Sequence, residues 1–207
     1  MLLYSADFGL KPNEVRIVGG QWRSRRIRFT PRPDLRPTPG RVRETLFNWL
    51  GQDLSGLVCL DLFAGSGALG FEAASRGARR TVMVELDRSA YAALERNRDA
   101  LAAAQVELVR ADALEFLRAD SGRYDVVFLD PPFSAGLMEA LPPLLQPRLS
   151  EAGRVYCESA KRLPWPRGWQ LLKEGRAGQV TFQLLRLEHD ESHGGVSGNL
   201  RSGHERS

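Results

Sequence analysis

The 207-residue sequence predicts an α/β protein with a doubly wound, mostly parallel sheet of seven strands, preceded by a small N-terminal β-hairpin and helix. Two observations predict the sheet. From Leu57 onward, short and almost wholly apolar runs alternate with segments of helical pattern, as in a parallel sheet that helices cover on both faces. After residue 160, two strand-like arms follow one another around a glycine-containing turn, which favours an antiparallel hairpin at the sheet edge.

Five strands are expected to form the parallel part of the sheet, over residues 57–63, 81–86, 105–112, 124–130 and 153–159. Helical segments separate them, and the clearest, over residues 87–104, places three apolar residues and Asn97 on one stripe. We expect Asn97 to make structural hydrogen bonds. Residues 169–188 are expected to close the sheet with a hairpin that turns around Gly175–Gly178.

Two elements are expected before the sheet. Residues 15–29 predict a β-hairpin that turns at Gly19-Gly20 and carries arginines on its second arm. Residues 36–50 predict a helix capped by Thr38, with Pro39 at its first position. We therefore divide the chain into a basic extension over 1–50, a core domain over 51–188 and a polar, disordered tail over 189–207.

The formal net charge of +4 is unevenly distributed along the chain. Residues 11–43 contain ten basic and two acidic residues, a net charge of +8, which leaves −4 for the rest of the chain. A charge run is often only a solvated surface, and that alternative applies here. A basic segment on a slightly acidic body nevertheless suggests a local contact with a polyanion.

Cysteine usage and the chain ends predict a cytoplasmic protein without a metal. Cys59 and Cys157 lie inside apolar runs and lack the spacing of metal ligands, as expected of buried, reduced thiols. The first ten residues have no basic flank and include Asp7, so they predict neither a signal peptide nor a membrane span. The three histidines all lie in residues 189–207, so the core offers no imidazole for catalysis or metal binding.

A glycine-rich segment, DLFAGSGALG over 61–70, follows the first strand and opens a helix. Gly65, Gly67 and Gly70 match the G-x-G-x-x-G pattern of dinucleotide-binding loops, and Glu85 follows twenty residues after Gly65, where an acid binds ribose hydroxyls. Asp61, however, places a carboxylate where it would repel a pyrophosphate. S-adenosylmethionine has no phosphate, and its ammonium and sulfonium groups suit an acidic pocket, so the sequence favours this cofactor.

The end of the third strand completes the predicted pocket. Asp112 is placed there for the adenine edge of the cofactor. Ligands of such sheets bind at the carboxyl ends of the strands, where all these residues recur. The predicted cofactor-binding residues are Asp61, Phe63, Gly65, Ser66, Gly67, Glu85, Leu86, Asp112 and Ala113.

The segment FLDPPF, over 128–133, ends the fourth strand with a carboxylate and two prolines. Pro131 keeps Asp130 out of the helical region and Pro132 fixes the following backbone, so the loop is rigid. The Asp130 carboxylate and the Pro131 carbonyl can accept both N–H groups of a planar exocyclic amine, while Phe133 stacks on the base. The predicted catalytic residues are Asp130, Pro131, Pro132 and Phe133.

The residues alone leave several functions open. A D-P-P-aromatic loop suits any planar amine, so guanine N2, adenine N6 in RNA or DNA and a protein glutamine amide all remain open. A non-catalytic RNA-binding protein that keeps this fold would need neither Asp130 nor the complete glycine loop. A dinucleotide-dependent oxidoreductase would share the glycines, but Asp61 disfavours it.

Five segments occur in the order of one known family over about residues 15–135: RIVGGQWRSRRI, RPTPGRVRETLFNWL, DLFAGSGALGFEAASRGA, VELD and FLDPPF. In these segments the chain resembles the RsmD family, the bacterial small-subunit rRNA guanine-N2 methyltransferases, which have the class I, Rossmann-like fold. The resemblance implies methyl transfer from S-adenosylmethionine to the N2 amine of a guanine in 16S rRNA. The implied partner is rRNA in the small ribosomal subunit or its assembly intermediate. Nothing in the sequence suggests an obligate oligomer, so we expect a monomer.

The resemblance also gives the basic segment a role as an arm that binds RNA phosphates. The arginines expected to contact RNA are Arg16, Arg23, Arg25, Arg26, Arg28, Arg41 and Arg43.

Overall fold

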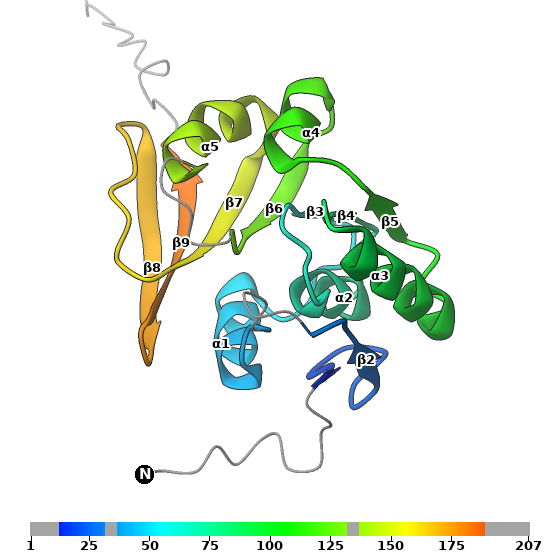
Figure 1. Ribbon diagram of the computed structural model, residues 1–207. Helices are drawn as coiled ribbons and strands as arrows, with labels where there is room; N and C mark the ends of the chain where they lie inside the picture. Colours follow the sequence, from blue (N-terminus) through cyan, green and yellow to red (C-terminus); the bar gives the residue numbers. More distant parts are fainter. Residues whose placement is uncertain (1–12, 32–36, 132–136, 189–207) are drawn as a thin grey trace, which may run out of the picture.

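The computed structural model describes residues 13–31, 37–131 and 137–188 and contains a seven-stranded sheet with helices on both faces (Figure 1). The strand order is β5-β4-β3-β6-β7-β9-β8, and the first five strands in this order run parallel. The parallel strands are β3 Val58–Asp61, β4 Arg80–Val84, β5 Val106–Val109, β6 Tyr124–Leu129 and β7 Leu149–Ser159. The chain runs outward from β3 to β5 and then returns to the other side of β3 with β6, so the strand order reverses between β3 and β6. The predicted doubly wound sheet is confirmed.

The parallel strands are apolar because helices cover both of their faces. Every residue of β3 is buried. Along β3, Cys59 belongs to an apolar cluster with α1 (Gly40–Leu50), whereas Leu60 belongs to a cluster on the opposite face with residues of α4 and α5. This two-sided burial explains the continuous apolar runs of the sequence.

The helices form two outer layers. The first face is covered by α1, α2 (Ala68–Ser75) and α3 (Arg88–Leu101), and the second by α4 (Ala113–Ala119) and α5 (Leu137–Leu145), with a short 3-10 turn, η1 (Gln146–Arg148), after α5 (Figure 1). The predicted structural role of Asn97 in α3 is confirmed. Its side chain accepts from Arg28 N over 3.0 Å and donates to the Arg28 carbonyl over 2.7 Å, so it joins α3 to the N-terminal hairpin.

The predicted hairpin at the sheet edge is confirmed: β8 (Trp169–Ala177) pairs antiparallel with β9 (Val180–Leu187), and β9 pairs antiparallel with β7. Its turn contains Gly178 with φ of +60°, a conformation that favours glycine. Gly175 lies within β8 and not in the turn, and a Cβ there would overlap the Phe182 ring. This glycine is therefore explained by strand packing.

The predicted N-terminal hairpin is also confirmed, with shorter strands, β1 (Glu14–Arg16) and β2 (Arg26–Arg28). Gly19 and Gly20 lie in the long connection between them and contact the end of α2. Gly20 has φ of +74°, and a Cβ there would overlap the Ser75 carbonyl. The apolar side chains of this segment share a core cluster with residues of α2 and α3; they are Val15, Ile17, Trp22, Ile27 and Phe29. Residues 13–31 are thus packed into the core by their apolar face.

The helix α1 begins at Gly40, later than predicted, with Pro39 as a cap that makes no side-chain hydrogen bond. The prediction that Thr38 caps this helix is wrong. Its hydroxyl donates to Glu158 Oε1 at the end of β7, over 2.9 Å. The hydroxyl that the local sequence pattern assigned to the helix end is thus used in a tertiary hydrogen bond.

Some predictions fall outside the described residues, namely those for Pro132, Phe133 and the tail over 189–207 with its histidines. Cys59 and Cys157 are buried free thiols, as predicted. Over the parts of the chain that the structure describes, none of the helices has the length and apolar character needed to cross a membrane. Within those same parts, no cluster of three or more histidine, cysteine or acidic side chains could hold a metal ion.

Candidate active site

Four adjacent strands end at a carboxylate on the same edge of the sheet. Along the sheet the order is Glu85 after β4, Asp61 at the end of β3, Asp130 after β6 and Glu158 near the end of β7. Asp61 and Glu158 are buried and Asp130 is half-buried. Parallel strands bring their carboxyl ends together, so residues distant in sequence form one acidic site where the strand order reverses.

The carboxylates at the strand ends hold the glycine loop between β3 and α2. Gly65 N–H donates to Glu85 Oε2 over 2.8 Å, and Asp87 N–H donates to Glu85 Oε1 over 2.7 Å. Gly70 N–H donates to Asp61 Oδ2 over 2.9 Å. These hydrogen bonds fix the loop and the two acids relative to each other before any ligand binds.

Close packing requires two glycines in this segment. Gly67 caps α2 with φ of +80°, and a Cβ there would lie 2.7 Å from the Phe71 ring. A Cβ at Gly70 would lie 2.7 Å from Met83 Sδ of β4. The absence of side chains lets the loop backbone lie against the strand ends.

The site carries more negative charge than the protein itself stabilises. Burial raises the pKa of Asp61 to about 7, and the nearby charge of Glu85 contributes to the rise, while the Gly70 N–H opposes it. Burial also raises the pKa of Asp130 well above its ordinary value, and the charges of Glu158 and Asp61 add to that rise. A ligand with positive charge would favour the ionised forms of these groups.

The other predicted cofactor residues surround the same edge. Asp112 caps α4, and its Oδ1 accepts from Leu114 N and Glu115 N. Leu86, which follows Glu85, is a large apolar residue with 65% of its surface exposed. Phe63 is half-buried, whereas Ser66 and Ala113 are buried. Asp112 therefore has a structural role as the cap of α4, and its contact with adenine stays a prediction.

Sequence reasoning missed Glu158. Leu129 pairs with Cys157, so the next residues along β6 and β7, Asp130 and Glu158, lie side by side. Oε1 of Glu158 accepts from the hydroxyls of Thr38 and Tyr156, each over 2.9 Å. The signal was present, because the predicted strand over 153–159 ends in Glu-Ser, but only the strand order places this acid beside Asp130.

The arginines predicted to bind RNA differ in their exposure. Glu14 forms ion pairs with Arg26 and Arg28, at 3.2 and 3.1 Å. The prediction that Arg43 binds RNA is wrong, because its side chain is 2% exposed and its Nη1 lies 3.0 Å from Glu72 Oε2. Arg16 is half-buried. The exposed arginines of this set are Arg23, Arg25, Arg26, Arg28 and Arg41.

Arg43 belongs to a buried network that joins the hairpin, α1 and α2. Glu72 in α2 accepts from the side chains of Arg43 and Arg76, at 3.0 and 2.9 Å. It also accepts from the backbone N–H groups of Val18 and Gly19, at 2.8 and 2.7 Å. Arg43 therefore acts in the interior as a structural cation.

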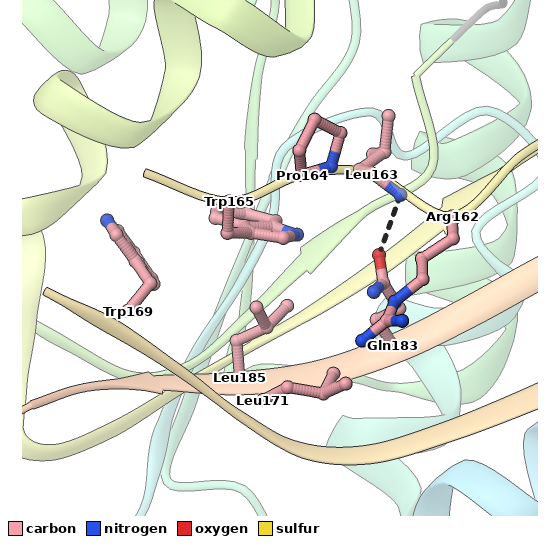
Figure 2. A pocket seen from close by; sticks show the side chains of 8 residues that line it. All are labelled: Arg162, Leu163, Pro164, Trp165, Trp169, Leu171, Gln183 and Leu185. Carbon is pink, nitrogen blue, oxygen red and sulfur yellow. Dashed lines mark hydrogen bonds between the residues drawn. The ribbon is translucent and has the colours of Figure 1, made fainter. Parts of the chain in front are cut away.

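A cavity of about 570 Å³ lies elsewhere, between the segment after β7 and the β8–β9 hairpin (Figure 2). The Trp165 and Trp169 rings line one end, with centroids 4.8 Å apart, and Gln183 at the other end accepts from Leu163 N–H. None of the predicted site residues that the structure describes is among its lining residues. The candidate site is therefore defined by the strand ends and not by this cavity.

Comparison with known proteins gives consistent matches along the chain. The family model "Conserved hypothetical protein 95" matches residues 15–186. Ribosomal RNA small subunit methyltransferase D of Escherichia coli is 43% identical over 188 residues, covering 86% of this chain and 95% of the relative. The protein of the same name from Haemophilus influenzae is 42% identical, covering 83% and 93%.

Solved structures agree with these matches. A putative methyltransferase of E. coli has a TM-score of 0.76 at 43% identity, covering 86% of this chain and 99% of the other. A putative methylase of H. influenzae has a TM-score of 0.70 at 40% identity, covering 83% and 97%. The chain therefore belongs to the family of the small-subunit ribosomal RNA methyltransferases D, the RsmD family.

Proposed function

We propose that the protein transfers a methyl group from S-adenosylmethionine to the exocyclic N2 amine of a guanine in small-subunit ribosomal RNA. The names of the relatives support this polymer as the substrate. The observation that carries the chemistry is Asp130, a half-buried carboxylate where the strand order reverses, with Asp61 and Glu158 on the neighbouring strands. Ribosomal subunits assemble in the cytoplasm, so we place the activity there, and we expect a monomer.

The residues at the strand ends fit S-adenosylmethionine better than a dinucleotide. Burial raises the pKa of Asp61 to about 7, so a cationic ligand would be stabilised here, whereas a pyrophosphate would be repelled. Asp61 would face the charged end of the cofactor, Glu85 its ribose and Asp112 its adenine. When bound, S-adenosylmethionine supplies an electrophilic methyl group on a sulfonium sulfur.

Asp130 is the proposed acceptor for the reacting amine. The lone pair of that amine is delocalised into the purine, so the nitrogen must become tetrahedral before it can attack. The Asp130 carboxylate and the Pro131 carbonyl accept from its N–H groups and stabilise this geometry. With the methyl group delivered to N2 and the sulfonium electron pair left on the departing sulfur, Asp130 would accept the proton that N2 loses.

The exposed arginines of the N-terminal hairpin are proposed to bind the RNA backbone. Arg23 and Arg25 lie in the connection between β1 and β2, and Arg26 and Arg28 lie on β2 with their side chains exposed. The apolar side of the same segment is packed against α2 and α3. The arm is thus anchored to the core while its basic side faces solvent.

Nucleoside mass spectrometry tests this function. The protein is incubated with labelled S-adenosylmethionine and small ribosomal subunits that lack the modification, beside Asp130→Ala and the control Asp99→Ala, which removes an exposed carboxylate of α3. The wild type and the control should form N2-methylguanosine. Asp130→Ala should lose at least about a hundredfold in rate, the cost of removing one preorganised group that stabilises the transition state.

The other outcomes each reject a defined part of the proposal. Methyladenosine would retain the amine chemistry and reject guanine. Bound S-adenosylmethionine without any methylated nucleoside would redirect the search to a protein amide. Full activity of Asp130→Ala would remove Asp130 from the mechanism.

A further inference from the structure

Glu158 is a buried carboxylate with one oxygen directed to the protein and one left for a ligand. Its side chain lies near the carboxyl end of β7, and the residue is 6% exposed. Oε1 accepts from both Thr38 and Tyr156, each over 2.9 Å. Within the described ranges, no hydrogen bond is made to Oε2, and this oxygen is not one of the fully enclosed side-chain atoms that lack a partner. Oε2 is therefore accessible, and it can accept a hydrogen bond from a ligand.

The strand order places Glu158 on the substrate side of the site. Glu85 and Asp61 end β4 and β3 and hold the glycine loop, which forms the cofactor half. Asp130 follows on β6, and Glu158 follows on β7, on the side of Asp130 away from that loop. When the amine of a base is held at Asp130, the part of its Watson–Crick edge next to the amine can therefore lie against Glu158, away from the cofactor.

The hydrogen bonds of Glu158 select its acceptor form. Burial raises the pKa of Glu158, but the hydroxyls of Tyr156 and Thr38 oppose that rise because they donate to the carboxylate. The two hydroxyls thus favour the ionised form of Glu158, in which Oε2 can act only as an acceptor.

An acceptor beside the reacting amine distinguishes the purines. Guanine presents two adjacent kinds of donor on its Watson–Crick edge, the N1–H and the N2 amine. Adenine presents its N6 amine beside N1, which is an acceptor and would face a second acceptor. An ionised carboxylate at this position thus favours guanine and rejects adenine.

We propose that Glu158 determines base specificity, by accepting the guanine N1–H at Oε2 while Asp130 accepts from the N2 amine. This inference rests on the proposed function. It assigns Thr38 and Tyr156 as positioning residues, which fix the Glu158 carboxylate through Oε1. It also gives the segment before α1 a role in the site, because Thr38 lies there.

The test compares two bases that share the N2 amine and differ at N1. Small subunits are reconstituted with rRNA that carries guanosine or 2-aminopurine riboside at the nucleotide methylated in the experiment above. In 2-aminopurine, N1 is an acceptor. The wild type should prefer guanosine in kcat/KM by about ten- to a hundredfold, the usual discrimination of a well-placed base contact.

Glu158→Gln should reverse this preference. The amide oxygen can still accept from Thr38 and Tyr156, so the Nε2 donor replaces Oε2 and faces N1 of the base. The ratio of kcat/KM should shift by about a hundredfold toward 2-aminopurine. The 2-aminopurine fluorescence with S-adenosylhomocysteine present should show tighter binding by the variant without any methyl transfer. Glu174→Gln, an exposed change on β8, should leave the ratio unaltered.

Each contrary result has a separate meaning. If Glu158→Gln slows both substrates equally, Glu158 only supports Thr38 and α1, and the inference fails while the proposed function stands. If the wild type methylates no guanosine, the proposed function has failed first. If Glu158→Gln does not fold, Tyr156→Phe is tested in its place. A smaller preference for guanosine over 2-aminopurine in kcat/KM supports the inference, and an unchanged preference overturns it.

Discussion

Asp61 is buried where its charge opposes folding. Its pKa is about 7 in the folded protein, above the value near 4 of an exposed aspartate, so the folded state binds the proton more tightly than the unfolded state does. The stability of the fold should therefore fall as pH rises from about 4 to about 7, and stay low above that. Functional sites commonly keep a buried charge that lowers the stability of the fold, because binding of the ligand requires that charge.

Replacing Asp61 with Asn should stabilise the protein at high pH. The amide oxygen can still accept from Gly70 N–H, and the buried charge is gone. The free energy of unfolding, measured by urea denaturation, should exceed that of the wild type by on the order of 4 kcal/mol at pH 8 and by less than half of that at pH 5. Asp99→Asn, an exposed change on α3, should have the same small effect at both pH values. Equal effects of Asp61→Asn at pH 5 and pH 8 would contradict the argument.

Single residues show where sequence reasoning stops. The acids and glycines of the loop could be placed because strand ends and turn glycines follow from local patterns. Arg43 could not be distinguished from its exposed neighbours, because a count of charges contains no information on burial. Thr38 matched the pattern of a helix cap, but Glu158 lies 120 residues away in sequence and takes its hydroxyl. Assigning either residue correctly requires the tertiary structure.

At the scale of elements, α2 links the glycine loop to the N-terminal hairpin. Gly67 caps one end of the helix, and the other end receives the hairpin through Ser75, whose carbonyl accepts from Gln21 N over 2.7 Å. Between these ends, Glu72 neutralises Arg43 and Arg76, whose side chains are 2% and 7% exposed. One carboxylate thus holds three segments together.

Glu72→Ala should destabilise the fold strongly. It removes the carboxylate to which two buried guanidinium groups and two backbone N–H groups donate, so the free energy of unfolding should fall by about 3–5 kcal/mol. Glu107→Ala is the control, since it breaks an ion pair with Arg80 whose partners are 51% and 43% exposed. That change should cost about 0–1 kcal/mol. Similar losses in urea denaturation for both variants would show that the buried network contributes no more than a surface pair.

At the scale of the whole molecule, the charge is divided between an acidic strand edge and a basic arm. Binding of RNA by the arm should weaken steeply with salt, because each neutralised phosphate releases counterions. Changing Arg23, Arg25 and Arg26 together to Ala should reduce the slope of log affinity against log salt concentration by about 2–3, measured by filter binding to small-subunit rRNA.

A second triple variant controls for net charge. Arg118→Ala, Lys173→Ala and Arg176→Ala remove three exposed cations from α4 and β8, which lie on other parts of the molecule. This variant should keep most of the salt dependence. If the two triple variants lose the same slope, the protein binds RNA through its general charge and the hairpin is not a specific arm.

The fold as a whole was predictable because its strands are buried on both faces and therefore stand out as apolar runs. The order of the strands was less accessible, since pairing between β7 and β9 or between β6 and β7 depends on contacts far apart in sequence. Because the strand order could not be read from local patterns, Glu158 was missed, although its neighbour Asp130 was identified. Local patterns thus identify the elements and the chemistry of each strand end, and topology brings those ends together.

The packing of α1 has a consequence for the order of events during synthesis. Trp49 at the end of α1 packs against Phe182 of β9, with ring centroids 5.3 Å apart, and the Thr38 hydroxyl donates to Glu158 of β7. More than a hundred residues must be translated between these partners, which takes on the order of 10 s at usual bacterial rates. The hairpin can pack on α2 and α3 early, but α1 completes its contacts with β7 and β9 late, so the base-binding side of the site forms only when the chain is almost finished.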